Sequence, residues 1–558
     1  MLLVFGNDPC DGLDGKLVLF RFFTFLAGWL RRKLGCPLNV LALEAPQTNE
    51  DRMAPNDKQS RPKARVAKGF RDVLPDEIRG LRTMLAKIQG VYESYGFEPV
   101  EQPFIEYTDA LGKFLPDQDR PNAGVFSFQD EDEQWLSLRY DLTAPLARYV
   151  AENFQKLPTP FRSYRQGWVF RNEKPGPGRF RQFMQFDADT VGSSSPAADA
   201  EVCMTAADTM EALGILRGQY VMRFSHRGLL DGFLEVIGIT EDNKKLAVLR
   251  TIDKRDKVTE VGFRNLLGKG RRDESGAFIE GNHLEEWQAA AVIEFLAVRV
   301  VQKPAVESEN VNAALGLSSV PTLIERNLSL SGHPKYMVAM FDLLTIADLC
   351  SKAGYGENQI RFDPTVVRGL EYYTGPVFEC ELLMDTKDED GNTVRFGSVG
   401  GGGRYDDLVA RFTGQQVPAT GFSIGVSRLY SALKLVGKAT TLQTLAPVVI
   451  TVMDKDRIGD YWRMVQQLRA AGIRAEMSLG AANMGKQMKY ADKRGAPLVV
   501  IQGADEKAKG EVTIKDLRLG SEMAASIATR EEYASQRLAQ VSVPEAELVA
   551  QVKKMLAQ

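Results

Sequence analysis

The stretch that ends at Gly375 constrains this chain more than any other, because it concentrates polar chemistry in a few residues. From Arg368 onward it carries a cation, a carboxylate (Glu371) and two adjacent phenols (Tyr372 and Tyr373). A buried structural strand seldom holds so many polar groups, since each then needs a partner. Neighbouring residues of a strand point to opposite faces, so the two tyrosines cannot serve one purpose. Two interpretations stay open: a core strand with one buried tyrosine and a surface arginine, or part of a binding site.

The composition is that of a soluble globular protein and narrows the possible functions. The 558 residues are 44% hydrophobic and 26% charged, enough chain for about two to four domains. The net charge of -3 gives no general attraction to nucleic acid, so any RNA contact must come from local basic patches. Five cysteines form no CxxC pair, and three histidines lie far apart. This argues against a disulfide framework and favours a reducing compartment; no protein ligand for a metal can be named.

The first sixty residues differ from the rest of the chain. The apolar run Phe22–Leu30 is too short to span a bilayer as a helix, and three cations follow it where a signal peptide has small residues. Residues 44–65 are polar and contain proline, as linkers do. We therefore expect residues 1–60 to be an accessory or disordered extension. Residues 1–52 are either that extension or an upstream misreading of the start codon, and a membrane-touching anchor is the third alternative.

The spacing of apolar residues predicts a helix from Asp76 to Tyr95, closed by Gly96, and a strand over 97–104. Further on, a strand ends near residue 140, and a second helix begins at Thr143. Asp141 and Thr143 lie at that junction. They either cap the helix and complement its dipole, or they hold an ammonium group.

Residues 161–190 predict a long hairpin whose loop, 172–180, is broken by two prolines and two glycines. Arg171 and Glu173 share strand parity, and an arginine fork suits a phosphate group. On the returning strand Gln185, Asp187 and Asp189 alternate and so share one face. That row is either plain solvent exposure or one wall of a site.

The C-terminal part predicts a separate domain. Four consecutive glycines at 400–403 allow close backbone approach, and a strand–helix unit follows over 421–429. From residue 447 strands alternate with helices, which indicates a small α/β domain. Lys486, Lys489 and Lys493 form one basic stripe on a helix, either a solubilising face or an RNA contact. The basic stretch 244–272 has the same two interpretations.

The segment RGLEYYTG, residues 368–375, closely resembles the histidine-binding signature of histidyl-tRNA synthetases. The predicted units over 76–104, 161–190 and 421–429 resemble motifs 1, 2 and 3 of class II aminoacyl-tRNA synthetases, in the family's order. The resemblance covers roughly residues 61–535. It implies an α+β fold, with a class II synthetase-like antiparallel sheet core and helical insertion, followed by a small α/β anticodon-binding domain. The implied boundaries are 61–226 for the first part of the catalytic core, 227–345 for the insertion, 346–440 for the second part of the core, 446–535 for the anticodon-binding domain and 536–558 for a helical tail.

The resemblance also implies roles for single residues. Arg171 would hold the α-phosphate of ATP, with Glu173 in the same site. Arg428 would contact the γ-phosphate, although Ser427 replaces the more usual glutamate before it. Arg368 and Arg171 would be the catalytic cations. The metal that the resemblance implies is Mg²⁺, which would bridge phosphate oxygens of ATP.

The amino acid and tRNA contacts follow from the same comparison. Asp141, Thr143 and Gln185 would bind the amine of histidine, and Asp189 and Tyr373 its imidazole ring. The remaining implied contacts are Arg171, Arg368 and Tyr372 for histidine, and Lys174, Arg179, Lys486, Lys489 and Lys493 for tRNA. In many relatives the hairpin loop reads an extra guanosine at the tRNA 5′ end, but here that loop is mostly proline and glycine.

The implied activity is ATP-dependent activation of L-histidine to histidyl-adenylate and its transfer to tRNA(His). The expected partners are ATP, histidine, tRNA(His) and a second copy of the chain, with no membrane, in the cytoplasm. A non-catalytic alternative is a regulatory subunit of histidine biosynthesis, or a histidine or tRNA sensor. Such relatives often lose the charged site residues, which are present here.

Overall fold

The chain divides into two compact units, residues 1–65 and 66–558. A computed structural model describes the second unit and the last residues of the first. The residues described are 63–111, 124–174, 180–255, 258–272, 276–296, 330–369, 373–387, 393–438, 446–479, 483–518 and 540–557. The predicted extension over 1–60 lies outside them. Among the helices described, none has the length and apolarity that crossing a membrane requires.

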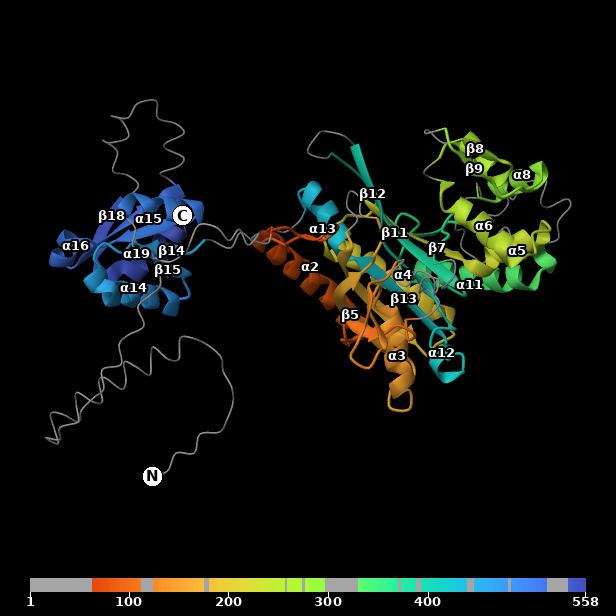
Figure 1. Ribbon diagram of the computed structural model, residues 1–558, viewed down its shortest axis with the longest axis horizontal. Coiled ribbons are helices and arrows are strands. Elements are labelled where there is room, and N and C mark those ends of the chain that lie inside the picture. Colours follow the sequence, from red (N-terminus) through yellow and green to blue (C-terminus); the bar gives the residue numbers. More distant parts are fainter. Residues whose placement is uncertain are drawn as a thin grey trace, which may run out of the picture. The chain divides into compact units, whose positions relative to one another are not determined.

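The catalytic part is built on an eight-stranded sheet of order β1-β5-β6-β13-β12-β11-β7-β10 (Figure 1). Pairing is antiparallel from β5 to β7 and parallel at both edges, β1 with β5 and β10 with β7. This confirms the predicted class of fold. The strands are β1 Glu98–Pro99, β5 Phe161–Phe170, β6 Gln182–Val191, β7 Tyr220–His226, β10 Ile360–Phe362, β11 Pro376–Lys387, β12 Thr393–Arg404 and β13 Ala419–Gly425.

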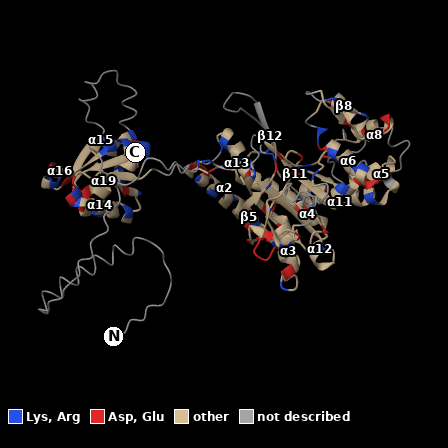
Figure 2. Cartoon of the chain, in the orientation of Figure 1, with Lys and Arg blue, Asp and Glu red and all other residues tan. Residues whose placement is uncertain are grey.

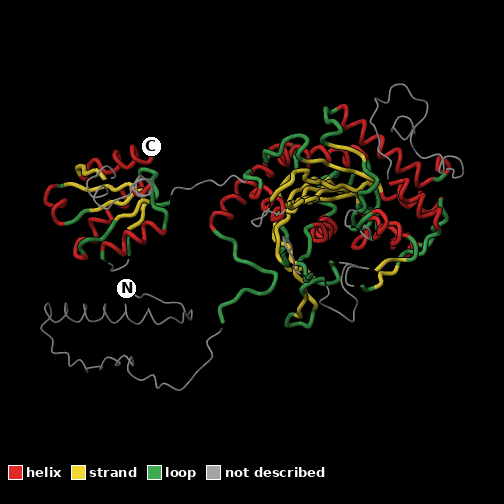
Figure 3. Tube along the Cα trace, turned by 90° about the horizontal axis from the view of Figure 1, so that it is seen from above, coloured by secondary structure: helices red, strands yellow, loops and turns green. Residues whose placement is uncertain are grey.

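Helices cover one face of this sheet, and Figure 3 shows them in red along the yellow strands. The predicted helix over 76–95 is present as α2 (Pro75–Ser94), which packs with α4 (Pro196–Ala212) and α13 (Val426–Leu435). Tyr92 of α2 meets Phe186 of β6 edge-on, with ring centroids 5.1 Å apart. Because Phe186 faces the helices, the odd-numbered residues of β6 project from the opposite face.

The predicted strand over 97–104 is much shorter in the structure, where only Glu98–Pro99 pairs with β5. Pro99 and Pro103 lack the N–H that a ladder needs, which limits pairing to one edge. The chain then enters a small sheet of order β2-β4-β3, and α3 follows where a helix was expected. These elements are β2 Ile105–Tyr107, β3 Ser127–Gln129, β4 Trp135–Leu138 and α3 Thr143–Asn153.

The region between the two core parts is mainly helical, as predicted. It contains α8 over Glu286–Leu296, and residues 297–329 lie outside the described part. The helix α11 (Pro334–Lys352) crosses the predicted boundary at residue 345, because it packs against α5 of the insertion and α4 of the core. The other elements are α5 Arg227–Val236, α6 Asp242–Ile252, α7 Glu260–Leu267 and the hairpin β8 Gly270–Arg272 with β9 Phe278–Glu280.

The C-terminal domain has a five-stranded sheet of order β15-β14-β16-β17-β18. The segment 536–558, predicted as a helical tail, instead supplies β18 (Gln540–Pro544) and α19 (Leu548–Leu556). β18 pairs with β17, and α19 buries Leu548 and Val552 in the domain core. The domain therefore extends well beyond residue 535. Its remaining elements are β14 Val448–Ile450, α14 Ile458–Ala470, β15 Ala475–Met477, α15 Met484–Lys493, β16 Leu498–Ile501, α16 Ala504–Lys509 and β17 Glu511–Asp516.

Candidate active site

A cavity of about 620 Å³ opens on the face of the large sheet opposite α2. Its wall is built from segments that lie far apart in sequence: the start of α3, both strands of the β5–β6 hairpin, the signature, the glycine run of β12 and the β13–α13 junction. The volume is typical of a small-molecule site. The predicted residues in the wall are Asp141, Thr143, Arg171, Glu173, Gln185, Arg368, Tyr373 and Arg428.

Glycines let the signature lie directly on the sheet. A Cβ at Gly369 would lie 2.3 Å from Cδ2 of Tyr373, and one at Gly403 would lie 2.7 Å from the same ring. Gly369 also has a φ of +53°, which side-chain-bearing residues rarely adopt. The tyrosine ring is thus held between the signature and β12, and burial raises the pKa of its hydroxyl. Tyr372 lies outside the described residues.

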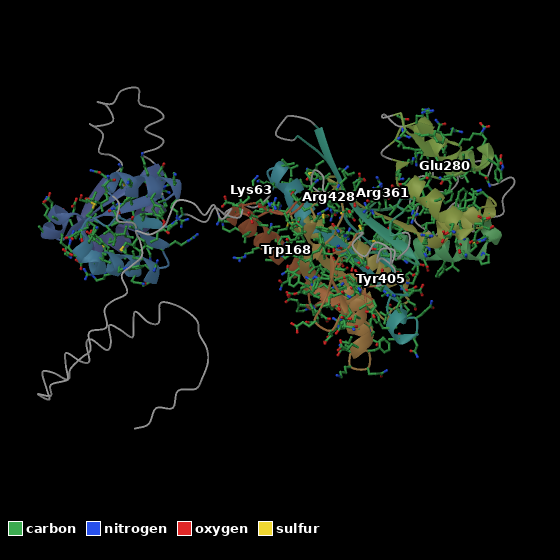
Figure 4. The ribbon with its side chains drawn as sticks, in the orientation of Figure 1. Lys63, Trp168, Glu280, Arg361, Tyr405 and Arg428 are labelled. Carbon is green, nitrogen blue, oxygen red and sulfur yellow. The ribbon has the colours of Figure 1, made fainter. Side chains whose placement is uncertain are left out.

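Three arginines line the same cavity. The Nε of Arg171 donates to the carbonyl of Tyr140 at 3.1 Å, and its guanidinium lies 5.1 Å from the ring centroid of Phe183. Arg428 comes from the first turn of α13 and donates to the carbonyl of Phe396 (Figure 4). Arg368, from the signature, is anchored by a carboxylate and keeps 41% of its side chain exposed. Fixed cations around one cavity suit a ligand with several negative oxygens.

Ser427, which stands where related sequences usually have glutamate, joins two motifs. Its hydroxyl accepts the backbone N–H of Met184 at 3.0 Å. This contact ties the first turn of α13 to β6, so the arginine that follows Ser427 is positioned against the hairpin that carries Arg171.

Asp141 caps a helix and also lines the cavity. Its Oδ1 accepts the backbone N–H groups of Thr143 at 3.2 Å and Ala144 at 3.0 Å, which caps α3. Its side chain also lines the cavity beside that of Thr143. Burial raises the pKa of the Asp141 carboxyl, and the bond from Ala144 and the nearby Arg171 oppose that shift.

Gln185 is the polar residue of β6 that reaches the cavity wall. Its Nε2 donates to the hydroxyl of Ser423, on the neighbouring strand β13, at 2.6 Å. Its Oε1 is buried and has no hydrogen-bond partner among the described residues. The amide therefore presents a free acceptor, as a site for an ammonium group requires.

Asp189 is not part of the cavity wall, although the sequence predicts that it binds imidazole. It is buried, forms an ion pair with Arg165 of β5 and accepts a hydrogen bond from the Tyr405 hydroxyl. A Cβ at Gly421 would lie 1.8 Å from its Oδ1, so the carboxylate is packed tightly against β13. Both of its oxygens already have partners, which argues against a direct role in binding.

Sequence reasoning missed Arg165, Tyr405 and Ser423. Tyr405, which Figure 4 labels, follows the glycine run, and Arg165 lies opposite Asp187 across the β5–β6 hairpin. A cation facing two carboxylates across a predicted hairpin is a signal that could have identified Arg165. No comparable signal marks Ser423, because its position depends on the pairing of β6 with β13.

The residues predicted to contact tRNA lie outside the cavity. Lys174 is exposed at the end of the hairpin strand, and Arg179 lies outside the described residues. Lys486, Lys489 and Lys493 are all exposed on α15 of the C-terminal domain, whose basic residues are blue in Figure 2.

The antiparallel sheet carries one arginine at the end of a long hairpin strand and another at the start of the helix after the last strand. This is the organisation of class II aminoacyl-tRNA synthetases. The chain belongs to the histidyl-tRNA synthetase family. The family model "Histidyl-tRNA synthetase" matches residues 69–429, and the model "Anticodon binding domain" matches residues 447–555.

Individual relatives agree with this assignment. The chain is 57% identical over 510 residues to the histidine–tRNA ligase of Mesorhizobium japonicum, covering 90% of this chain and 98% of the relative. It is equally similar to that of Bradyrhizobium diazoefficiens, with 90% and 97% covered. The crystal structure of the histidyl-tRNA synthetase from Nostoc superposes with a TM-score of 0.62 at 29% identity, covering 88% of this chain and 100% of that one.

Proposed function

We propose that this chain is a histidine–tRNA ligase, which activates L-histidine with ATP and transfers the histidyl group to tRNA(His). The observation that carries the proposal is one cavity in which three arginines lie beside a carboxylate and an amide. The arginines suit the phosphates of ATP, and Asp141 with Gln185 suits the amine of an amino acid. A regulatory subunit or sensor would not need three phosphate-binding arginines, and the two curated relatives described above, each 57% identical, are named as ligases.

In the first step a carboxylate oxygen of histidine attacks the α-phosphorus of ATP. The bond between that phosphorus and the bridging oxygen to the β-phosphate breaks, and pyrophosphate leaves with the electron pair. Arg171 and Arg368 stabilise the negative charge that spreads over the phosphate oxygens, and Arg428 holds the γ-phosphate end. The protein contributes orientation and charge neutralisation rather than a covalent intermediate.

Mg²⁺ belongs to the proposal as the companion of ATP. This ion keeps several waters and is bound by one or two carboxylates together with substrate phosphates, so it does not need an all-protein cage. The donors present near the arginines fit that mode. Glu173 in the cavity wall offers a carboxylate that would hold it. The metal would add neutralising charge to the phosphates.

In the second step a terminal ribose hydroxyl of tRNA attacks the carbonyl carbon of the adenylate, and AMP leaves. We assign tRNA contacts to Lys174 and Arg179 of the hairpin loop and to the lysine stripe on α15. Lysines position nucleic acid through its phosphates without reading sequence. Dimerisation through the motif 1 region and a cytoplasmic location complete the proposal, since charged tRNA is used where ribosomes translate.

The decisive experiment is ATP–pyrophosphate exchange with purified full-length protein and each amino acid in turn, followed by aminoacylation of tRNA(His). We expect exchange with histidine alone and transfer of the histidyl group to tRNA(His). Histidine binding without exchange would instead identify a sensor. Exchange with another amino acid would refute the assignment of substrate.

A further inference from the structure

Asp187 is a buried carboxyl that the proposed chemistry leaves without a role. It lies between Gln185 and Asp189 on the cavity-facing side of β6, and only 1% of its surface is exposed. Neither of its oxygens has a well-formed hydrogen bond among the residues that the structure describes. An unpaired buried carboxyl is costly, so a residue of this kind calls for a physical explanation.

The residues around Asp187 compensate only part of the negative charge that its carboxylate carries when ionised. Arg165 lies opposite it on β5, but the guanidinium is bonded to Asp189. One cation is thus shared by two carboxyls. On the other side Ser423 of β13 lies directly opposite Asp187, and its hydroxyl is close enough to lower the pKa of that carboxyl. Ser423 is therefore the group able to give Asp187 a proton in a hydrogen bond.

The direction of the hydrogen bonds at Ser423 then determines how Gln185 is oriented. A serine hydroxyl has a single proton to donate. If that proton points to Asp187, the hydroxyl can only accept from Gln185, so the NH₂ group of the amide must face Ser423. The Nε2 of Gln185 does face Ser423, at 2.6 Å, which leaves Oε1 as the free acceptor of a residue that lines the cavity. With the amide reversed, Gln185 would present hydrogens to the ammonium group that it is proposed to bind.

We propose that Asp187 is a positioning residue for amino acid recognition, which acts through Ser423 to hold the Gln185 amide with its oxygen toward the α-amino group of the substrate. The relay runs from carboxylate to hydroxyl to amide, with each group orienting the next. This inference rests on the proposed function, because it takes a free amino acid as the ligand. It assigns to Asp187 a role that differs from those of the residues in the cavity wall.

The test compares two ligands that differ only in the amine: histidine and 3-(imidazol-4-yl)propanoate. Dissociation constants are measured by calorimetry at about pH 8, above the pKa of about 7 to which burial raises the Asp187 carboxyl, on the full-length wild type and on Asp187→Asn. The asparagine side chain is neutral: its NH₂ group can donate to Ser423 and its carbonyl is a weaker acceptor than a carboxylate, so the Ser423 proton is no longer directed to this side. We expect the dissociation constant for histidine to rise about 10- to 100-fold, the effect of a hydrogen bond to a charged group. The constant for the deaminated ligand should stay within about twofold, which a general distortion of the site would not allow.

A double-mutant cycle with Ser423→Ala separates a relay from two independent contacts. If Asp187 acts through Ser423, then Asp187→Asn has little further effect once the hydroxyl is absent, so the two changes are not additive. Ser423→Ala removes one oxygen and also serves as the test should Asp187→Asn fail to fold; it should weaken histidine binding and spare the deaminated ligand.

Three results would overturn the relay: unchanged histidine affinity in both single variants, equal losses for both ligands, or additive losses. A wild type that binds no histidine would overturn the proposed function itself, which distinguishes that failure from failure of the relay alone.

Discussion

The guanidinium of Arg368 forms an ion pair with the carboxylate of Glu379 on β11, behind the wall of the cavity. Glu379 is almost fully buried and also accepts a hydrogen bond from Arg223 of β7 at 3.1 Å. Arg368 is thus held from behind while 41% of its side chain stays exposed. A cation fixed before the ligand arrives needs no reorganisation when charge develops on a phosphate.

Replacing Arg368 by alanine should reduce histidine-dependent pyrophosphate exchange by about 10²- to 10³-fold, the usual effect of removing one preorganised donor to a developing charge. The melting temperature should change little, because the side chain is half exposed. Arg217→Ala is the matched control, since that arginine is exposed and pairs with Glu211 far from the cavity wall. Near-normal exchange in the Arg368 variant would show that Arg368 is not a catalytic residue.

Replacing Asp189 by alanine should have a different outcome. The change leaves the guanidinium of Arg165 buried without its partner, and breaking a buried pair in this way costs about 3–5 kcal/mol of stability. Because Asp189 lies outside the cavity wall, any loss of affinity for histidine should follow from the disturbed structure and be matched by a similar loss for ATP. Denaturant unfolding and calorimetry measure the two quantities separately. Unchanged stability together with a loss of histidine affinity alone would show instead that Asp189 binds histidine directly.

The stability of the protein should depend on pH through Asp187. Burial raises the pKa of this carboxyl to about 7, against the opposing effect of Arg165, whereas in the unfolded chain it is about 3.9. Between those values the folded state binds a proton that the unfolded state lacks. Stability from this group is therefore present below about pH 4 and is lost as the pH rises to about 7, at about 1.4 kcal/mol per unit.

Asp187→Asn cannot titrate and should flatten that dependence. Denaturation midpoints of the ligand-free protein, measured across this pH window, give the comparison. Asp199, whose pKa burial also raises, contributes equally to both proteins and cancels in the difference, whereas Asp141 interacts with Asp187 and adds to that difference. Parallel pH profiles for wild type and variant would contradict the prediction.

Reversing the charge of the lysine stripe by changing Lys486, Lys489 and Lys493 to glutamate should weaken tRNA binding without affecting the chemistry. We expect the KM for tRNA to rise by about tenfold or more and to become less dependent on salt, because phosphate contacts are lost. Pyrophosphate exchange needs no tRNA and should be unchanged. The matched control reverses Lys553 and Lys554, which are exposed on α19 of the same domain.

The hairpin loop leads to a prediction about tRNA identity. Residues 175–178 are proline and glycine, which carry no side-chain donor or acceptor for a base edge. The enzyme should therefore depend little on an extra guanosine at the tRNA 5′ end, with specificity shifted to the discriminator base or the anticodon. Aminoacylation of two transcripts that differ only in that nucleotide provides the measurement. A loss of about 1–3 kcal/mol or more on its removal would contradict the idea.

Short-range patterns in the sequence were sufficient to predict the family, the sheet-based core and most residues of the cavity wall. The helix at 75–94, the hairpin that carries Arg171 and the strand–helix unit that carries Arg428 each depend on local periodicity and on turn residues. Such signals are contained within about twenty residues. These patterns did not predict the structure of residues 536–558, because β18 is a short edge strand that forms only by pairing with β17.

The alternation of Gln185, Asp187 and Asp189 placed the three side chains on one face of a strand from sequence alone, since the period of a strand is two. Their separate environments came from the neighbouring strands. Arg165 on β5 takes Asp189 into a buried pair, and Ser423 on β13 meets Gln185 and Asp187. Strand register decides which residues meet across a sheet, and it is set by packing of the whole core. Local periodicity thus determined that the three side chains share one face of the strand. Which of them lines the cavity, which is buried without a partner and which forms an ion pair was decided only by the tertiary structure.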